Sequence, residues 1–115
     1  MNGIGHIEIP SRNLAESMAF YSSAFGWECG KESDFYAFFK TPNGVSGGFD
    51  PSSTPSSDAG TTIYIEVDDM NAALAKIGKL GGRVLKPKTE IGGEMGFYAL
   101  FTDPHGNRMG FWSAD

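Results

Sequence analysis

The sequence predicts an α+β fold built from two tandem βαβββ modules, and two repeated patterns predict it. A stretch of 15 residues occurs twice, as FYAFFKTPNGVSGGF from Phe35 and as FYALFTDPHGNRMGF from Phe97. At a shift of 56 residues, Ile7-x-Ile9 also matches Ile63-x-Ile65. In a repeat protein each copy forms one structural unit. The identities between the two 15-residue copies fall at Phe35/Phe97, Tyr36/Tyr98, Ala37/Ala99, Phe39/Phe101, Pro42/Pro104, Gly44/Gly106, Gly48/Gly110 and Phe49/Phe111.

A chance resemblance between two aromatic hairpins is the alternative to a true repeat. The helix signals argue against it, because they repeat at the same shift, with Asn13 matched by Asp69 and Gly26 by Gly82. At 115 residues the chain has the length of one domain. We therefore predict a single domain over 1–115, with module one at 1–49, a linker at 50–60 and module two at 61–115.

In module one, apolar and polar residues alternate over 3–10, which predicts a strand with its isoleucines on one face and His6 and Glu8 on the other. Asn13 with Glu16 is typical of a helix start, and Gly26 of a helix end. The apolar positions of this helix are Leu14, Met18, Tyr21 and Phe25. Further strands are predicted over 27–30, 35–40 and 45–49, with a hairpin turn at 42–44.

The linker 50–60, DPSSTPSSDAG, is rich in Pro and Ser and has no apolar period. Module two repeats the order of module one. A strand is predicted over 61–67, a helix capped by Asp69 with Met70, Leu74 and Ile77 as its apolar stripe, and strands over 83–86, 97–102 and 108–112. His105 falls in the last hairpin turn, where we expect it to face solvent. The glycine-rich stretch 90–96 suits a phosphate loop or a mobile loop, and the lack of a following Lys/Ser and helix favours the mobile loop.

Composition limits the function classes. A net charge of −5 without a basic cluster argues against a nucleic-acid partner. No apolar run reaches the roughly 18 residues of a membrane helix, and no signal peptide is recognised. The single Cys29 excludes an internal disulfide and predicts a cytoplasmic location. Cys29 is either a nucleophile or a packing residue, and a lone cysteine favours packing. The nine Phe indicate an aromatic-rich core or pocket.

Three motifs, HIEIPSRNLAESMAFYSSAFGW, YIEVDDMNAALAKIGKLGG and FTDPHGNRMGFW, resemble the vicinal oxygen chelate superfamily. That superfamily includes glyoxalase I, the bleomycin-resistance proteins and extradiol dioxygenases, and the resemblance covers essentially the whole chain. It implies two βαβββ modules whose sheets form an incomplete barrel around a cleft, with helices outside, and it implies a homodimer.

In the metal-dependent members of that superfamily, the first and fourth strands of each module supply one metal ligand each. The resemblance places these four positions on His6, Gly48, Thr62 and Gly110. Only His6 is a plausible ligand, and a catalytic metal needs three or more protein ligands. We therefore expect no metal and no other cofactor. Because Gly48 and Gly110 lack side chains, we also expect them to leave open space in the cleft.

Strand alternation predicts a cleft whose lining binds a small molecule: His6, Glu8, Thr62, Tyr64, Glu66, Arg108 and Trp112. Glu8, Glu66 and His6 are the candidates for acid–base catalysis. Each has a simpler interpretation. His6 is then a remnant ligand, Glu8 and Glu66 are solvated, and Tyr64 and Trp112 pack in a dimer interface.

The sequence predicts a metal-independent small-molecule-binding protein of the glyoxalase/bleomycin-resistance type, with its ligand in the cleft of a homodimer. Three alternatives stay open. The first is a metal-free enzyme that uses Glu, His or Tyr side chains. The second is a glyoxalase-type lyase or isomerase related to lactoylglutathione lyase, which requires a metal site not recognised in the sequence. The third is a module that binds another protein.

Overall fold

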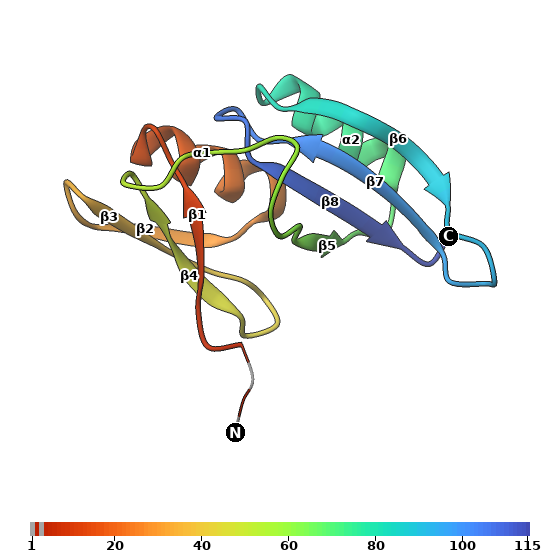
Figure 1. The fold of residues 1–115 in the computed structure, drawn as a ribbon, viewed down its shortest axis with the longest axis horizontal. Helices are drawn as coiled ribbons and strands as arrows, with labels where there is room; N and C mark the ends of the chain where they lie inside the picture. Colours follow the sequence, from red (N-terminus) through yellow and green to blue (C-terminus); the bar gives the residue numbers. More distant parts are fainter. Residues whose placement is uncertain (1, 3) are drawn as a thin grey trace. The chain divides into compact units, whose positions relative to one another are not determined.

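The computed structural model describes residue 2 and residues 4–115, and the chain divides into two compact units, Met1–Pro55 and Ser56–Asp115. The division falls inside the predicted linker. Each unit contains one helix and one mixed four-stranded sheet (Figure 1). The two units are therefore the two predicted βαβββ modules.

The first unit runs β1 (Ile7–Pro10), α1 (Leu14–Phe25), β2 (Glu28–Ser33), β3 (Tyr36–Lys40) and β4 (Ser46–Asp50). Its strands lie in the order β1-β4-β3-β2, with β1 parallel to β4 and the other pairs antiparallel. This order brings the two ends of the module together, because the first strand hydrogen-bonds to the last.

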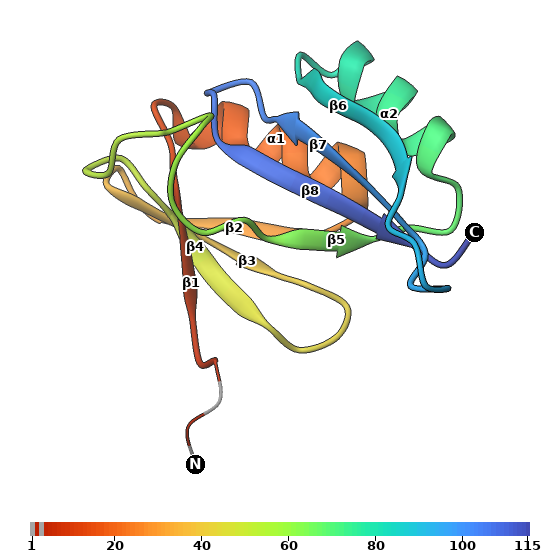
Figure 2. The same cartoon turned by 45° about the vertical axis from the view of Figure 1, so that its right-hand side comes forward.

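The second unit repeats this arrangement with β5 (Tyr64–Glu66), α2 (Met70–Lys79), β6 (Arg83–Glu90), β7 (Phe97–Thr102) and β8 (Arg108–Ser113). The strand order is β5-β8-β7-β6, again with one parallel pair, β5 and β8. Figure 2 shows α2 alongside the long, curved β6. The topology confirms that the duplication seen in the sequence is a duplication of the backbone.

Both helices begin as the cap residues predict. The Asn13 Oδ1 accepts a hydrogen bond from the Glu16 amide at 3.0 Å, and the Asp69 Oδ1 accepts one from the Ala72 amide at 3.0 Å. Each bond satisfies one of the amide groups that the first helical turn leaves without a partner. Gly26 ends α1 in the left-handed conformation, at φ 69°, which favours glycine.

The core of the first unit is aromatic and lies between α1 and the sheet. Tyr21 is fully buried, with its ring centroid 5.1 Å from that of Trp27 and 5.3 Å from that of Phe49. The ring centroid of Phe39 lies 4.9 Å from that of Trp27 and 5.2 Å from that of Phe49. Large aromatic side chains bury much apolar area each, so they fill a small module efficiently.

The second unit has a core of mixed composition. The predicted stripe of α2 is confirmed, because Met70, Leu74 and Ile77 are all buried. Phe101 and Phe111 are fully buried in the sheet, and their ring centroids are 4.5 Å apart. In each last strand one face carries the buried Phe49 or Phe111, and the opposite face carries Gly48 or Gly110. That second face carries the candidate functional groups.

Several predicted boundaries are wrong. The first strand begins at Ile7, and Ile4, expected to face the helix, is 74% exposed; Gly3 lies outside the described residues. The second strand runs to Ser33, and β6 extends to Glu90. In α1 the buried residues are Ser17, Phe20 and Tyr21, so the buried face is rotated relative to the predicted stripe. The buried Ser17 hydroxyl bonds to that of Ser11 at 2.6 Å, which satisfies both polar groups.

Candidate functional site

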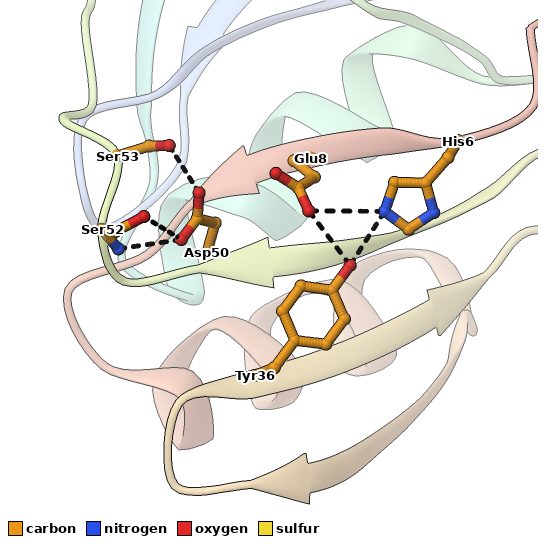
Figure 3. A network of polar contacts seen from close by, with 6 residues as sticks. All are labelled: His6, Glu8, Tyr36, Asp50, Ser52 and Ser53. Atoms are coloured by element: carbon orange, nitrogen blue, oxygen red, sulfur yellow. Dashed lines mark hydrogen bonds and ion pairs between the residues drawn. The ribbon is translucent and has the colours of Figure 1, made fainter.

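His6, Glu8 and Tyr36 meet on the polar face of the first sheet (Figure 3). The Tyr36 hydroxyl lies 2.8 Å from His6 Nε2 and donates to Glu8 Oε2 at 3.4 Å. His6 Nε2 and Glu8 Oε2 are 3.6 Å apart. About half of each of the His6 and Glu8 side chains is exposed. The three groups form one hydrogen-bonded cluster that a ligand can reach, and we call it the Tyr36 cluster.

Gly48 is the residue that makes the Tyr36 cluster possible. Tyr36 comes from β3, whereas Glu8 comes from β1, and β4 lies between these two strands. Residue 48 is the register partner of both Glu8 and Phe38, so its side chain would stand in the path of the Tyr36 ring. A Cβ at this position would overlap the Tyr36 hydroxyl and Cζ. Glycine is therefore required here for close approach of a neighbouring group.

The environment of the Tyr36 hydroxyl disfavours its ionised form. Burial raises its pKa most, and the charge and hydrogen bond of Glu8 raise it further. The carboxylates of Glu32 and Asp50 add smaller effects in the same direction. The hydroxyl therefore keeps its proton at neutral pH and can act as a hydrogen-bond donor or a general acid.

Asp50, on the same face, already has partners. Its Oδ1 accepts from the Ser52 amide at 2.9 Å and the Ser52 hydroxyl at 2.6 Å, and its Oδ2 accepts from the Ser53 hydroxyl at 2.7 Å (Figure 3). The Ser52 hydroxyl, followed by that of Ser53, lowers the pKa of the Asp50 carboxyl. Asp50 stays charged at neutral pH, and its negative charge acts on the Tyr36 cluster from a distance.

On the second sheet, the glycine that corresponds to Gly48 is also covered by a tyrosine. A Cβ at Gly110 would overlap the ring of Tyr64. Tyr64 comes from β5, the neighbour of β8, and pairs in register with Gly110. Tyr64 is 49% exposed, and its hydroxyl has no hydrogen-bond partner among the described residues. The expectation that Gly48 and Gly110 leave open space is wrong, since a tyrosine fills each position.

The other predicted site residues of the second unit lie around this position, with different partners. The Trp112 Nε1 donates to the Met95 carbonyl at 2.9 Å, so the indole contacts the glycine-rich loop. The Arg108 Nη2 donates to the Gly60 carbonyl at 2.7 Å. Glu66 is exposed and Thr62 half-buried. A ligand-binding role for these four residues stays a prediction.

Tyr36 is the residue that sequence reasoning missed. It belongs to the repeated stretch, but the glycine of the second sheet, Gly110, is covered by Tyr64 and not by Tyr98, the repeat partner of Tyr36. Strand parity places Tyr36 and Phe38 on one face, but the register partner of Gly48 is Phe38, so parity did not indicate that the Tyr36 ring covers this glycine. His105 is a second correction. It is only 6% exposed, and its amide donates to Asp103 Oδ1 at 2.9 Å.

Cys29 does not have the surroundings of a nucleophile. Burial raises the pKa of its thiol, and the neighbouring Glu28 charge raises it further. Thiolate is the reactive form, and both effects disfavour it. The preference for packing over catalysis agrees with this environment.

The described residues of each unit do not fit a divalent metal at the ligand positions that the resemblance implies. The Gly48 and Gly110 positions offer no donor atom, and tyrosine rings fill the space where a carboxylate would stand. The His6 Nε2 already contacts the Tyr36 hydroxyl. Among residues 2 and 4–115, no group of three or more His, Cys, Asp or Glu side chains is arranged to hold a metal ion. A catalytic divalent ion needs about three such ligands.

Comparison with known proteins places the chain among relatives that share its fold. It is 28% identical over 126 residues to CFP32 of Mycobacterium bovis, which is described as a candidate glyoxylase. That match covers 95% of this chain and 44% of the relative, so the chain spans less than half of that protein. A glyoxylase-like domain-containing protein of Didymella fabae is 30% identical over 117 residues, covering 90% of this chain and 88% of the relative.

A solved structure has the same fold at low sequence identity. The fosfomycin resistance protein FosX of Listeria monocytogenes, complexed with Mn(II) and sulfate, superposes with a TM-score of 0.83 at 18% identity. The match covers 98% of this chain and 90% of that one. No helix among the described residues is long and apolar enough to cross a membrane. Residues 3–111 match the Glyoxalase/Bleomycin resistance protein/Dioxygenase superfamily, and the chain belongs to that family.

Proposed function

We propose that this chain is a metal-independent small-molecule-binding protein of the glyoxalase/bleomycin-resistance type, working in the cytoplasm as a homodimer. The observation that carries the proposal is the Tyr36 ring over Gly48. A fourth-strand metal ligand needs the volume that this ring occupies. The His6 imidazole on this sheet face bonds to the same hydroxyl. The Tyr36 cluster therefore replaces a coordination site with a hydrogen-bonding site.

The experiment is metal analysis of untreated protein, before and after dialysis against manganese, nickel, zinc and iron(II). We expect far less than one ion per chain in every case, and the same result for His6→Ala. Glu90→Gln, on an exposed strand end of the second unit, is the matched control. One tightly held ion per chain that is lost in His6→Ala but kept in Glu90→Gln would contradict the proposal.

The homodimer is tested by light scattering during gel filtration. The chain has a mass of 12.3 kDa, and we expect twice that mass in solution, unchanged by a chelator. A monomer at micromolar concentration would remove the dimer from the proposal and leave metal-independent binding intact.

A metal-free enzyme is the second candidate, and the hydrogen bonds of the Tyr36 cluster favour it. The Tyr36 hydroxyl keeps its proton at neutral pH, so it can donate that proton to a substrate oxygen or nitrogen while His6 supplies a replacement proton. Glu8 is the acceptor for a proton that the substrate releases. Turnover that falls by about 100-fold or more in Tyr36→Phe, with ligand affinity retained, would identify an enzyme rather than a binding protein.

A lyase or isomerase related to lactoylglutathione lyase is the third candidate, carried by the family and by the names of the relatives. The same metal analysis tests this candidate, because such an enzyme requires a metal ion, and the side chains at the expected ligand positions do not fit one.

A further inference from the structure

We propose that the polar face of the first sheet binds a small organic ammonium ion at the Tyr36 cluster, an inference that rests on the proposed metal-independent binding function. The ligand's charged nitrogen contacts the Glu8 carboxylate, and its carbon atoms lie against the Tyr36 ring. Three independent features of this face support a cation rather than an anion or a metal ion.

The first feature is charge. Three carboxylates, Glu8, Glu32 and Asp50, act on the Tyr36 hydroxyl. The lysines of this sheet are bound to other carboxylates. Lys31 Nζ lies 2.9 Å from Asp34 Oδ1, and Lys40 Nζ lies 3.4 Å from Glu28 Oε2. No Lys or Arg side chain forms an ion pair with Glu8 in the described part of the chain. The face near Tyr36 is therefore anionic, and an anionic ligand is repelled.

The second feature is the supply of protons within the Tyr36 cluster. In a neutral histidine one ring nitrogen accepts and the other donates. If His6 Nε2 accepts, Tyr36 donates to it and Glu8 receives no proton from either group. If His6 Nε2 donates to the Tyr36 hydroxyl, Tyr36 donates its own proton to Glu8. The distance from the Tyr36 hydroxyl to Glu8 Oε2 is then 3.4 Å, which is long for such a bond. In both cases Glu8 Oε1 has no donor among the described residues. Glu8 thus keeps the capacity to accept bonds from an ammonium N–H.

The third feature is an aromatic ring beside the carboxylate. The Tyr36 ring covers Gly48, which is the register partner of Glu8, and Tyr36 stays partly exposed. The Phe38 ring leans toward the other edge of the sheet, over Gly30 of β2, and Lys40 Nζ lies 5.6 Å from its centroid there. An ammonium ion held by Glu8 therefore meets the Tyr36 ring, to which it is attracted by the cation–π interaction.

The experiment is an NMR titration with three probes of similar size: 2-phenylethylammonium, the neutral 2-phenylethanol and the anionic 3-phenylpropionate. We expect 2-phenylethylammonium to shift the resonances of His6, Glu8, Tyr36 and Gly48, and to bind at least about tenfold more tightly than either other probe. The charge-assisted bond to Glu8 provides that difference, because a tenfold change in affinity corresponds to about 1.4 kcal/mol.

Two variants and a control locate the cation. Glu8→Gln removes the charge and keeps the shape, so we expect about tenfold weaker binding of 2-phenylethylammonium. Tyr36→Phe keeps the ring and loses the hydroxyl, so binding changes by no more than a few-fold. Glu90→Gln removes one negative charge from the second unit and leaves the affinity unchanged. Amide spectra of each variant establish that it is folded.

Equal or tighter binding of 3-phenylpropionate, the same loss in Glu90→Gln as in Glu8→Gln, or no shift with any probe would each overturn the inference. Its failure is distinguishable from that of the proposed function. Binding of the neutral or anionic probe by metal-free protein removes only the ligand class, whereas a stoichiometric metal ion at His6 removes the proposed function.

Discussion

In both sheets a tyrosine ring covers a glycine of the last strand, but the two rings come from different strands. Each last strand has a glycine at the repeat position, Gly48 or Gly110, and a tyrosine ring lies over each. On the first sheet the ring comes from β3 and crosses β4 to reach β1, whereas on the second it comes from β5. The duplication therefore preserved the backbone and the glycine, but not the strand that supplies the aromatic ring.

The repeat partners of the two tyrosines show how the units diverged. Tyr64 corresponds to Glu8, so the second sheet has a ring where the first has a carboxylate. Tyr36 corresponds to Tyr98, whose ring has Lys86 Nζ at 5.3 Å from its centroid and covers no glycine. Only the first sheet thus combines a hydroxyl, an imidazole and a carboxylate. A duplicated fold can therefore carry its cluster of polar functional groups in one of its two modules.

The largest expected change in stability comes from Gly48→Ala, which tests whether the Tyr36 ring crosses over β4. Gly48→Ala inserts a methyl group where the hydroxyl lies, so the ring must move and lose both hydrogen bonds. We expect the free energy of unfolding, measured by chemical denaturation, to fall by about 1–3 kcal/mol. Adding Tyr36→Ala should recover much of this loss, because residues in contact are coupled in a double-mutant cycle.

Gly110→Ala is the matched control in the second unit. Tyr64 is half-exposed and makes no hydrogen bond within the described chain, so it can swing outward, and we expect a loss below about 1 kcal/mol. Equal losses in the two glycine variants would mean that the hydrogen bonds of Tyr36 add nothing and that the contrast between the sheets is only geometric.

Variants of the two helix caps test whether the two modules have equally stabilised helices. Asn13→Ala and Asp69→Ala each remove one bond of 3.0 Å to an amide of the first turn. We expect each to reduce the free energy of unfolding by about 1 kcal/mol. A difference of more than about 1 kcal/mol between the two variants would show that the units differ in their helices as well as in their sheet faces.

Removal of single hydroxyl groups sharpens the contrast between the tyrosines. Tyr36→Phe loses the bonds to His6 and Glu8, so we expect the free energy of unfolding to fall by about 0.5–1.5 kcal/mol. Tyr64→Phe loses no described bond and should stay within about 0.5 kcal/mol of the wild type. A larger loss in Tyr64→Phe than in Tyr36→Phe would reverse the comparison.

The smallest effect is the pH dependence that Tyr36 causes. Because its pKa is raised in the folded protein, the unfolded chain loses this proton first as the pH rises through about 10. Stability that is complete below this pH is then lost as the pH rises through the folded-state pKa. We expect the wild type to lose more stability than Tyr36→Phe between about pH 9.5 and 11, followed by denaturation at each pH and by tyrosinate absorbance. Equal pH profiles would show that neither burial nor Glu8 raises the pKa of the Tyr36 hydroxyl.

Much of the fold was predictable because its determinants are local. The alternation of apolar residues, the cap residues and the repeated hairpin each involve neighbours in the chain, and they predicted both modules and the stripe of α2. Boundaries were less predictable. Ile4 looked like a strand residue by alternation, but β1 pairs with β4 only from Ile7, so Ile4 lies before the paired part of the strand.

The candidate site was predictable in part. Strand parity placed His6 and Glu8 on one face, and the structure brings them within 3.6 Å. Parity gave no sign that Tyr36 would reach them, because that contact depends on the register between β3 and β4 and on the strand order. His105 was mispredicted for a related reason, since burial of a turn depends on what packs over it.

By itself the sequence determined the duplicated architecture, the caps and the absence of donor atoms at Gly48 and Gly110, because these follow from residue identity and local periodicity. Only the tertiary structure decided what occupies the two glycine positions. Residues 36 and 48 are brought together by strand pairing. A glycine in a sequence indicates that another group can approach the backbone closely, but it does not indicate which side chain does so.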